Sequence, residues 1–334
     1  MADMREDQRR AFLAGAGFAA ARRVPLAGDA SARRYERIWI GGTSALLMDC
    51  PPHADEDTRL FLDLSRWLAG LGLSTAEILA EDADAGLVLL EDFGPDRFAE
   101  TLRDASPDAL YAAAIDVLDR IQRAALPDSI PLPPYDLDFA VNEAALVFDW
   151  YMPDPPADLA GAVAAALRAH LAPSLADPVV VLRDYHAENL FWLPQRDGTA
   201  RVGLIDYQGA RIGARAYDLA ALLTDARRDV APDLAAFGMR HFCAVTGADR
   251  EQVEFDCAAW AVQRNLKILG LFARLHLRDG KSGYLDLLPR VWRYLQADLG
   301  HPALADLADL IGDAIPVPDP DFIARLRRRA VSDA

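Results

Sequence analysis

The segment VVLRDYHAENLFWL, residues 180–193, constrains the fold more than any other part of the chain. It places an Asp, a His, a Glu and an Asn between two short apolar runs. Residues 179–182 and 190–193 have the length and apolar composition of buried strands. We therefore predict a polar loop that the sheet holds at both ends, with Asp184 and Asn189 on that loop.

A second carboxylate follows at the end of a further predicted strand. Residues 202–205 are apolar, and Asp206 comes directly after them. An Asp, an Asn shortly after it and then an Asp at a strand end is the arrangement of phosphoryl-transfer enzymes, in which the first Asp receives the acceptor hydroxyl. Mg²⁺ prefers oxygen ligands, and a few protein oxygens with the ATP phosphates complete its shell.

Asn189 and Asp206 are therefore candidates for the Mg²⁺ ligands, and Asp184 is the candidate catalytic residue. Each of the three residues alone is explained better as a turn or strand-end residue. The ordered set with its flanking strands favours a kinase site.

The composition is that of a folded protein, and the chain is long enough for two lobes. The chain has 334 residues, of which 52% are hydrophobic, enough for two substantial cores. Its net charge of −16 argues against nucleic acid as a partner, because affinity for a phosphate backbone comes from basic surfaces. ATP binding then requires a local cluster of basic residues.

Cysteine spacing and hydropathy indicate a cytoplasmic protein. Cys50, Cys243 and Cys257 show no spacing typical of metal sites, and we expect reduced thiols in or near the core. The start of the chain, MADMREDQRR, lacks the apolar stretch of a signal peptide, and no apolar run approaches the length of a membrane span. We expect no membrane association, and nothing in the sequence points to an obligate protein partner.

The amino-terminal region predicts a hairpin preceded by a phosphate-binding loop. Residues 3–20 predict an amphipathic helix, and strands at 35–40 and 44–50 flank a Gly-Gly turn. The loop GDAS before the hairpin offers Ser31 as a contact to ATP phosphates. An ordinary surface turn is the alternative.

The second strand of the hairpin lacks a residue that kinases of this kind usually place there. They hold the phosphates with a Lys, whereas SALLMDCPP has Met48 and no Lys. Arg33 and Arg34 stand just before the hairpin, and a guanidinium suits phosphate oxygens. We hypothesise that one of these two arginines takes over the role; a solvated strand edge is the alternative.

The next segment predicts the connection between the lobes. It contains a helix and two strands, at 55–71, 77–80 and 86–90, and then the turn EDFG. Adenine binds such hinges through backbone groups and apolar walls, so Glu91 and Phe93 are ATP-binding candidates by position. We divide the chain into a nucleotide-binding lobe, 1–92, and a helical lobe with the catalytic loop and acceptor site, 93–334.

Helical periodicity dominates the second lobe. It predicts helices at 107–125, 137–151 and 158–172, one from about Ala216, and two long helices separated at 279–283. Glu143, Asp149, Trp150 and Tyr151 combine carboxylates with aromatic rings, as many sugar-binding sites do. Buried aromatics beside solvated acids explain the same cluster.

Two further residues have candidate roles in this lobe. Asp218, in the first turn of its helix, either ties the catalytic loop together or caps the helix. Arg264, in QRNLKILGLFARL, could meet an anionic substrate. A solvated helix face is the alternative.

With these residues placed, the chain resembles the aminoglycoside phosphotransferase and choline kinase superfamily over nearly its whole length. The resemblance rests on GDASARRYERIWI, LLMDCPP, LLEDFG, RDYHAENLFWL, GLIDYQGARIGARAYDLAALLTDARRDV and QRNLKILGLFARL. It implies an α+β, two-lobed, protein-kinase-like fold with a small antiparallel sheet in the first lobe. It also implies that Asp184 is the catalytic base and that Asn189 and Asp206 hold Mg²⁺.

The same runs are similar to bacterial kinases of cell-wall sugars. This similarity implies a small-molecule amino-sugar substrate, N-acetylmuramate or N-acetylglucosamine, phosphorylated at the C1 hydroxyl during peptidoglycan recycling with ATP and Mg²⁺. An anomeric hydroxyl is more acidic than other sugar hydroxyls and asks less of its base.

Two other functions stay open. A pseudokinase fits the absent Lys, but losing one charge-stabilising donor costs about 3 kcal/mol, whereas enzymes lower barriers by roughly 8 to 23 kcal/mol. A kinase of the same superfamily that acts on an aminoglycoside or an amino alcohol would need an acidic acceptor pocket. The basic segment around Arg264 favours an anionic acceptor instead.

Overall fold

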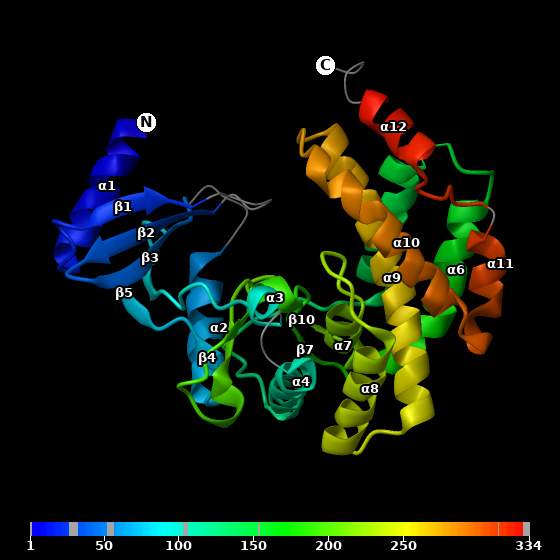
Figure 1. The fold of residues 1–334 in the computed structure, drawn as a ribbon, viewed down its shortest axis with the longest axis horizontal. Helices are drawn as coiled ribbons and strands as arrows, with labels where there is room; N and C mark the ends of the chain where they lie inside the picture. Colours follow the sequence, from blue (N-terminus) through cyan, green and yellow to red (C-terminus); the bar gives the residue numbers. More distant parts are fainter. Residues whose placement is uncertain are drawn as a thin grey trace. The chain divides into compact units, whose positions relative to one another are not determined.

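The computed structural model, drawn in Figure 1, describes residues 2–26, 33–51, 57–102, 106–152, 154–312 and 314–329. The chain divides into two units. Unit 1 comprises Met1–Asp104, Ala125–Ile130 and Glu188–Gln208, and unit 2 comprises Ala105–Ala124, Pro131–Ala187 and Gly209–Ala334. Unit 1 contains an antiparallel sheet and unit 2 is mostly helical, so the predicted α+β class is confirmed.

The larger sheet of unit 1 is fully antiparallel, with strand order β1-β2-β3-β6-β5. Its strands are β1 (Arg22–Pro25), β2 (Arg34–Ile40), β3 (Thr43–Asp49), β5 (Ile78–Asp82) and β6 (Leu87–Glu91), and α1 (Ala2–Gly15) lies beside it in Figure 1. The predicted hairpin is confirmed as β2 and β3, whereas β1 was not predicted. Alternate residues of the central strands, such as Ile38, Leu47 and Leu89, are fully buried and pack with Leu13 of α1.

The rest of unit 1 is a helical segment and a three-stranded sheet. Its elements are α2 (Thr58–Gly70), β4 (Ser74–Thr75), α3 (Phe98–Thr101), β8 (Leu190–Trp192), the 3₁₀ turn Gly198–Arg201 and β9 (Val202–Leu204). Asp57 starts α2, because its carboxylate accepts hydrogen bonds from the backbone N–H groups of Arg59 and Leu60. Strand β9 lies between β4 and β8 and delivers Asp206 just beyond its end.

Unit 2 is built from helices and one short ladder. The helices are α4 (Pro107–Arg123), α5 (Leu137–Leu146), a π-helix (Val147–Tyr151), α6 (Leu159–Leu171), α7 (Ala216–Leu223), α8 (Pro232–Thr246), α9 (Arg250–Leu277), α10 (Leu288–Leu299), α11 (Ala305–Ile311) and α12 (Pro320–Arg329). The strands of the ladder are β7 (Val179–Val181) and β10 (Arg211–Gly213), and 3₁₀ turns lie at Ala172–Leu175, Ser282–Leu287 and Pro302–Leu304. The predicted helices are confirmed, except that 137–151 divides into an α-helix and a π-helix. Helices α8 and α11 were not predicted, and for residues 322–334 the sequence left a final helix and a frayed end both open.

The strands on either side of the polar loop belong to different sheets. Strand β7 pairs with β10, whereas β8 pairs with β9. The prediction that one sheet holds the loop at both ends is therefore wrong. A strand's partner depends on residues far along the chain, and the apolar runs on each side of the loop carry no information about it.

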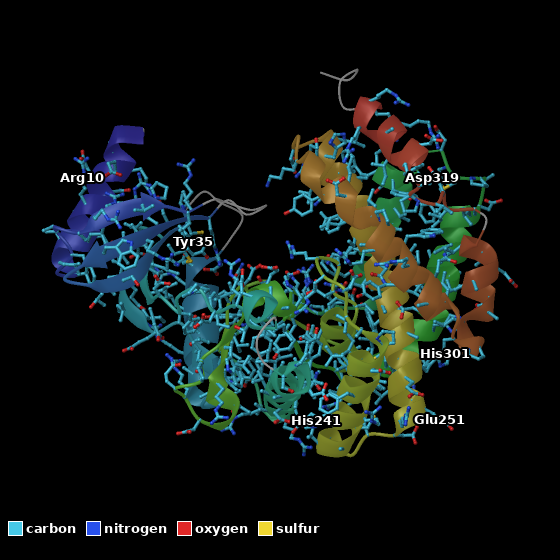
Figure 2. The ribbon with its side chains drawn as sticks, in the orientation of Figure 1. Arg10, Tyr35, His241, Glu251, His301 and Asp319 are labelled. Carbon is cyan, nitrogen blue, oxygen red and sulfur yellow. The ribbon has the colours of Figure 1, made fainter. Side chains whose placement is uncertain are left out.

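Polar side chains of unit 2 link two helices and cap a third. His241 of α8, labelled in Figure 2, lies 2.7 Å from a carboxylate oxygen of Asp116 on α4. Asp319, also labelled there, accepts a hydrogen bond from the backbone N–H of Phe322 and so starts α12. None of the helices in the described part of the chain combines the length and the apolar character that crossing a bilayer requires.

Helix α9 is the core element of unit 2. It has 28 residues, and residues on several of its faces, including Trp260, Leu266 and Leu269, are fully buried. Gly270 allows α5 to approach it closely, because a Cβ there would lie 2.2 Å from the carbonyl oxygen of Leu146. The π-helix begins at the next residue, so the irregular turn lies where the two backbones meet.

Gly270→Ala should destabilise unit 2 by at least about 3 kcal/mol, because the added methyl group meets backbone atoms that no side-chain rotation can move. The free energy of unfolding in urea measures this. Gly161→Ala is the matched control, since Gly161 also lies in a helix but has open space around it. That change should stabilise the protein by roughly 0.5–1 kcal/mol, and equal effects of the two substitutions would contradict the close contact.

Candidate active site

The loop that carries Asp184 is anchored by a buried carboxylate. Asp218, in the first turn of α7, accepts hydrogen bonds from the backbone N–H groups of Leu182 (2.6 Å) and Arg183 (2.8 Å). Burial raises the pKa of Asp218 to about 7, although the two backbone hydrogen bonds act in the opposite direction. The prediction that Asp218 ties this loop together is confirmed.

Asp184 is exposed and surrounded by positive charge. Protein atoms around the carboxylate act to raise its pKa, but Lys267 and Arg183 outweigh this effect, and the pKa lies below its ordinary value. Asp184 is therefore ionised at neutral pH. Arg183, just before it, has a φ of 72°, a strained conformation that the hydrogen bonds to Asp218 maintain.

Asp184 lines a pocket of about 470 Å³ that is formed entirely by unit 2, a volume suited to a small ligand. The acidic, basic and histidine side chains of the lining are Glu143, Arg183, Asp184, His186, Asp225, Arg227, Arg264, Lys267 and Arg274, joined by apolar residues that include Phe139, Ile268, Leu271 and Phe272. Five basic side chains thus face three carboxylates. The pocket is locally basic in a chain whose net charge is −16.

Glu143 organises two of these cations. Its carboxylate lies 2.6 Å from Nη2 of Arg183 and 2.9 Å from Nζ of Lys267, and it also accepts a hydrogen bond from the hydroxyl of Tyr135. Burial acts to raise the pKa of Glu143, but the two cations lower it below its ordinary value. The structure thus places Glu143 at the pocket, as an ion-pair centre.

The other members of the predicted aromatic cluster do not line this pocket. Tyr151 is buried, donates a hydrogen bond of 2.6 Å to the carbonyl of Pro316, and packs on Phe322 with ring centroids 4.7 Å apart. Asp149 is exposed and Trp150 is half-buried. Residues adjacent on a helix point in different directions, so this cluster in the sequence is not a cluster in space.

Arg264 does line the pocket, and its side chain is buried with 6% exposure. The alternative of a solvated face is wrong for this residue and for its neighbour Asn265, which is fully buried. His186, Asp225 and Lys267 also line the pocket but were not among the predicted site residues. The positions 264, 267, 271 and 274 share one face of a helix, and this periodicity is the signal that could have identified Lys267 and Arg274.

Asn189 and Asp206 lie together in unit 1. Nδ2 of Asn189 is 3.3 Å from Oδ2 of Asp206, and Nε2 of Gln208 donates to Oδ1 of Asp206 at 2.5 Å. Asp206 has a φ of 60°, uncommon for a residue other than glycine. The side chains of these two neighbouring residues include an amide oxygen and carboxylate oxygens, the types of ligand that Mg²⁺ takes in small number from proteins. No group of three or more acidic, His or Cys residues that could hold a metal occurs in the described parts of the chain.

The predicted phosphate contacts differ in their surroundings. Ser31 lies outside the described residues. Arg33 is buried with its guanidinium 5.2 Å from the ring centroid of Phe61, whereas Arg34 is exposed at the start of β2. Met48, at the strand position where the Lys is missing, is fully buried.

The predicted hinge residues pack within unit 1. Glu91 forms an ion pair with Arg196, and it accepts a hydrogen bond from the backbone N–H of Glu77. The ring of Phe93 lies 5.4 Å from that of Phe191 and 5.5 Å from the guanidinium of Arg196.

A family model and several curated proteins match the chain over most of its length. The model of the phosphotransferase enzyme family matches residues 22–255. The chain belongs to this family. It is 39% identical to an N-acetylmuramate/N-acetylglucosamine kinase of Caulobacter vibrioides, over 94% of this chain and 97% of that protein. A protein of the same name from Pseudomonas aeruginosa is 34% identical, over 86% of this chain and 87% of its own length.

The fold has similar relatives among solved structures. A choline/ethanolamine kinase family protein from Mesorhizobium loti superposes with a TM-score of 0.65 and 16% identity, over 97% of this chain and 99% of that one. The predicted superfamily and its kinase-like fold are confirmed, and the protein is a phosphotransferase enzyme.

Tyr151→Phe should lower the free energy of unfolding by about 1 kcal/mol, because the carbonyl of Pro316 loses its hydrogen-bond donor. The KM of the enzyme for its acceptor should not change, since Tyr151 does not line the pocket. Urea unfolding and steady-state kinetics measure the two quantities. A tenfold rise in KM at unchanged stability would instead place Tyr151 at the substrate.

Proposed function

We propose that the protein transfers the γ-phosphoryl group of ATP to the C1 hydroxyl of N-acetylmuramate and N-acetylglucosamine, and that it acts in peptidoglycan recycling. The observation that carries this proposal is Asp184, an ionised carboxylate on an anchored loop that lines a pocket of monosaccharide size. The names of the curated relatives supply the sugar class.

Asp184 acts as the base at the acceptor end of the reaction. It accepts the proton of the C1 hydroxyl while that oxygen forms its bond to the γ-phosphorus, and ADP leaves with the electrons of the broken bond. The proton passes from Asp184 to solvent afterwards. A carboxylate with a lowered pKa is a weak base, which suits an anomeric hydroxyl because that hydroxyl is comparatively acidic.

Unit 1 would supply the nucleotide end. We assign Asn189 and Asp206 as the Mg²⁺ ligands, and Ser31, Arg33 and Arg34 as phosphate contacts. Glu91 and Phe93 are assigned as the adenine hinge. We place the boundary between a nucleotide lobe, residues 1–92, and a helical lobe, residues 93–334, at this hinge. Bound Mg²⁺ would neutralise charge on the phosphates. The close pair of Asn189 and Asp206 supports the metal assignment.

The proposed place of action is the cytoplasm, where ATP is available. Cys50, Cys243 and Cys257 all lie in the described part of the chain and form no disulfide there, which fits a reducing compartment.

The charge of the pocket separates this proposal from the kinases of cationic acceptors. An aminoglycoside or an amino alcohol carries ammonium groups, which five basic side chains would repel. A lactyl carboxylate, as in N-acetylmuramate, suits this charge. The chain also has a candidate base, Asp184, and two candidate metal ligands, Asn189 and Asp206. A pseudokinase needs none of these for binding alone, so their presence favours an enzyme.

Asp184→Asn should lower kcat by roughly 10²–10⁴-fold, because the amide keeps the shape of the carboxylate but cannot accept the proton. The assay measures ATP consumption with Mg²⁺ and each amino sugar, and phosphorus NMR of the product shows whether the phosphate is on C1. Asp177→Asn is the control, since Asp177 is an exposed carboxylate outside the pocket. Full activity of Asp184→Asn would exclude Asp184 as the base.

Lys267→Met should move the acidic limb of the kcat/KM profile to higher pH by about one unit. Lys267 exerts the largest charge effect that lowers the pKa of Asp184, so its removal raises this pKa, and the base becomes protonated at a higher pH. Lys281→Met, which changes the only other lysine of the sequence, is the control outside the pocket. An acidic limb at the same pH in wild type and Lys267→Met would contradict the assignment of this limb to Asp184.

A further inference from the structure

Three buried side chains of the unit 2 pocket have polar atoms without partners. Asp225, His186 and Arg264 are 1%, 4% and 6% exposed, and all three line the pocket. Within the ranges that the structure describes, Oδ2 of Asp225, Nδ1 of His186 and Nη1 of Arg264 have no hydrogen-bond partner. A buried polar atom without a partner costs about 1–3 kcal/mol, so a ligand that satisfies all three atoms would bind well.

The neighbours of these side chains define which atoms donate and which accept. Nε2 of His186 lies 2.8 Å from Nη1 of Arg227, and a guanidinium can only donate, so Nε2 accepts and the proton of the neutral ring is on Nδ1. Burial lowers the pKa of His186 to about 4, which keeps the ring neutral at pH 7. Oδ1 of Asp225 accepts from the backbone N–H of Arg227 at 2.8 Å, which leaves Oδ2 as an acceptor.

The pocket therefore offers two N–H donors, from Arg264 and His186, beside one carboxylate acceptor. A ligand carboxylate or phosphate would satisfy the donors, but it has no proton for Asp225 and would be repelled by it. A secondary amide has both an acceptor oxygen and a donor N–H. Ile268, Leu271 and Phe272 line the same pocket and provide apolar surface for a methyl group.

We infer that Arg264, His186 and Asp225 bind the 2-acetamido group of the acceptor sugar. The amide oxygen accepts from Arg264 and His186, and the amide N–H donates to Oδ2 of Asp225. This inference rests on the proposed function, in which both candidate acceptors carry the acetamido group. Such a site discriminates against glucose, which has a hydroxyl at C2, and against glucosamine, whose ammonium group offers no acceptor to Arg264 and His186.

Asp225→Asn tests the inference with little change of shape. The backbone N–H of Arg227 still needs an acceptor, so the amide oxygen takes the place of Oδ1 and the new NH₂ group opposes the sugar N–H. Affinity for N-acetylglucosamine should fall about 10- to 100-fold, whereas affinity for glucose should stay within about twofold. Calorimetric titration of the full chain with each sugar measures this without requiring turnover.

Arg264→Gln is the second variant, and it should also reduce the preference for N-acetylglucosamine over glucose. Asp233→Asn is the control, since Asp233 is exposed in the first turn of α8 and lies outside the pocket. Circular dichroism and the unfolding midpoint confirm that each variant is folded.

Three outcomes would overturn the inference. The first is that Asp225→Asn and Arg264→Gln weaken binding of both sugars equally, which would give these residues a structural role. The second is that they change the preference for N-acetylmuramate over N-acetylglucosamine, which would assign the site to the lactyl carboxylate. The third is that the wild type binds glucose as tightly as N-acetylglucosamine. If the wild type prefers N-acetylglucosamine in binding but phosphorylates neither amino sugar, the proposed function fails and the acetamido site stands.

Discussion

Two hydrogen bonds from one loop to the buried carboxylate of Asp218 fix the geometry on which the rest of the pocket depends. They come from the backbone N–H groups of Leu182 and Arg183. Each contributes about 0.5–1.5 kcal/mol when the acceptor is neutral and about 1.5–3 kcal/mol when it is charged. That is enough to offset the roughly 1–3 kcal/mol cost of holding Arg183 in the left-handed region. Asp184 is the next residue, so the same bonds fix where its carboxylate leaves the chain.

The electrostatics of the pocket depend on Glu143 as much as on the cations. Arg183 and Lys267 would repel each other without the carboxylate between them, and burying either charge alone would be costly. With Glu143 present, both cations stay close enough to lower the pKa of Asp184. A basic pocket therefore persists in a strongly acidic chain because an acid holds its cations in place.

Sequence periodicity predicted the helices and strands whose conformation depends on their own residues. It did not predict those whose conformation depends on contacts with distant parts of the chain. Alternating residues predicted β2 and β3, and helical spacing predicted α4 and α6. The π-helix at Val147–Tyr151 could not be predicted, because it lies where Gly270 of α9 meets the backbone of α5, more than a hundred residues along the chain.

The candidate site residues also fall into those that the sequence identified and those that it did not. Asp184, Asn189 and Asp206 follow from a local motif, and the structure places each at the end of a short strand or on an anchored loop. His186 lies in the polar loop that the sequence singled out, but neither His186 nor Asp225 was assigned a role, because the sequence does not show which polar residues are buried beside one pocket. For Arg264 the sequence suggested a substrate contact, but the usual exposure of arginine side chains favoured a solvated position. The close packing of α9 buries this side chain instead.

The strand position where related kinases carry a phosphate-binding lysine is Met48 here, and the sequence contains only two lysines. Both Lys267 and Lys281 come late in the sequence, so a cationic side chain from the first 266 residues can only be an arginine or a protonated histidine. Arginine is a fork of fixed geometry rather than a point charge, and it binds phosphate oxygens in pairs. Losing one charge-stabilising donor costs about 3 kcal/mol of the roughly 8–23 kcal/mol that enzymes supply. The loss of this lysine therefore removes only a part of that energy, and phosphoryl transfer can proceed without it.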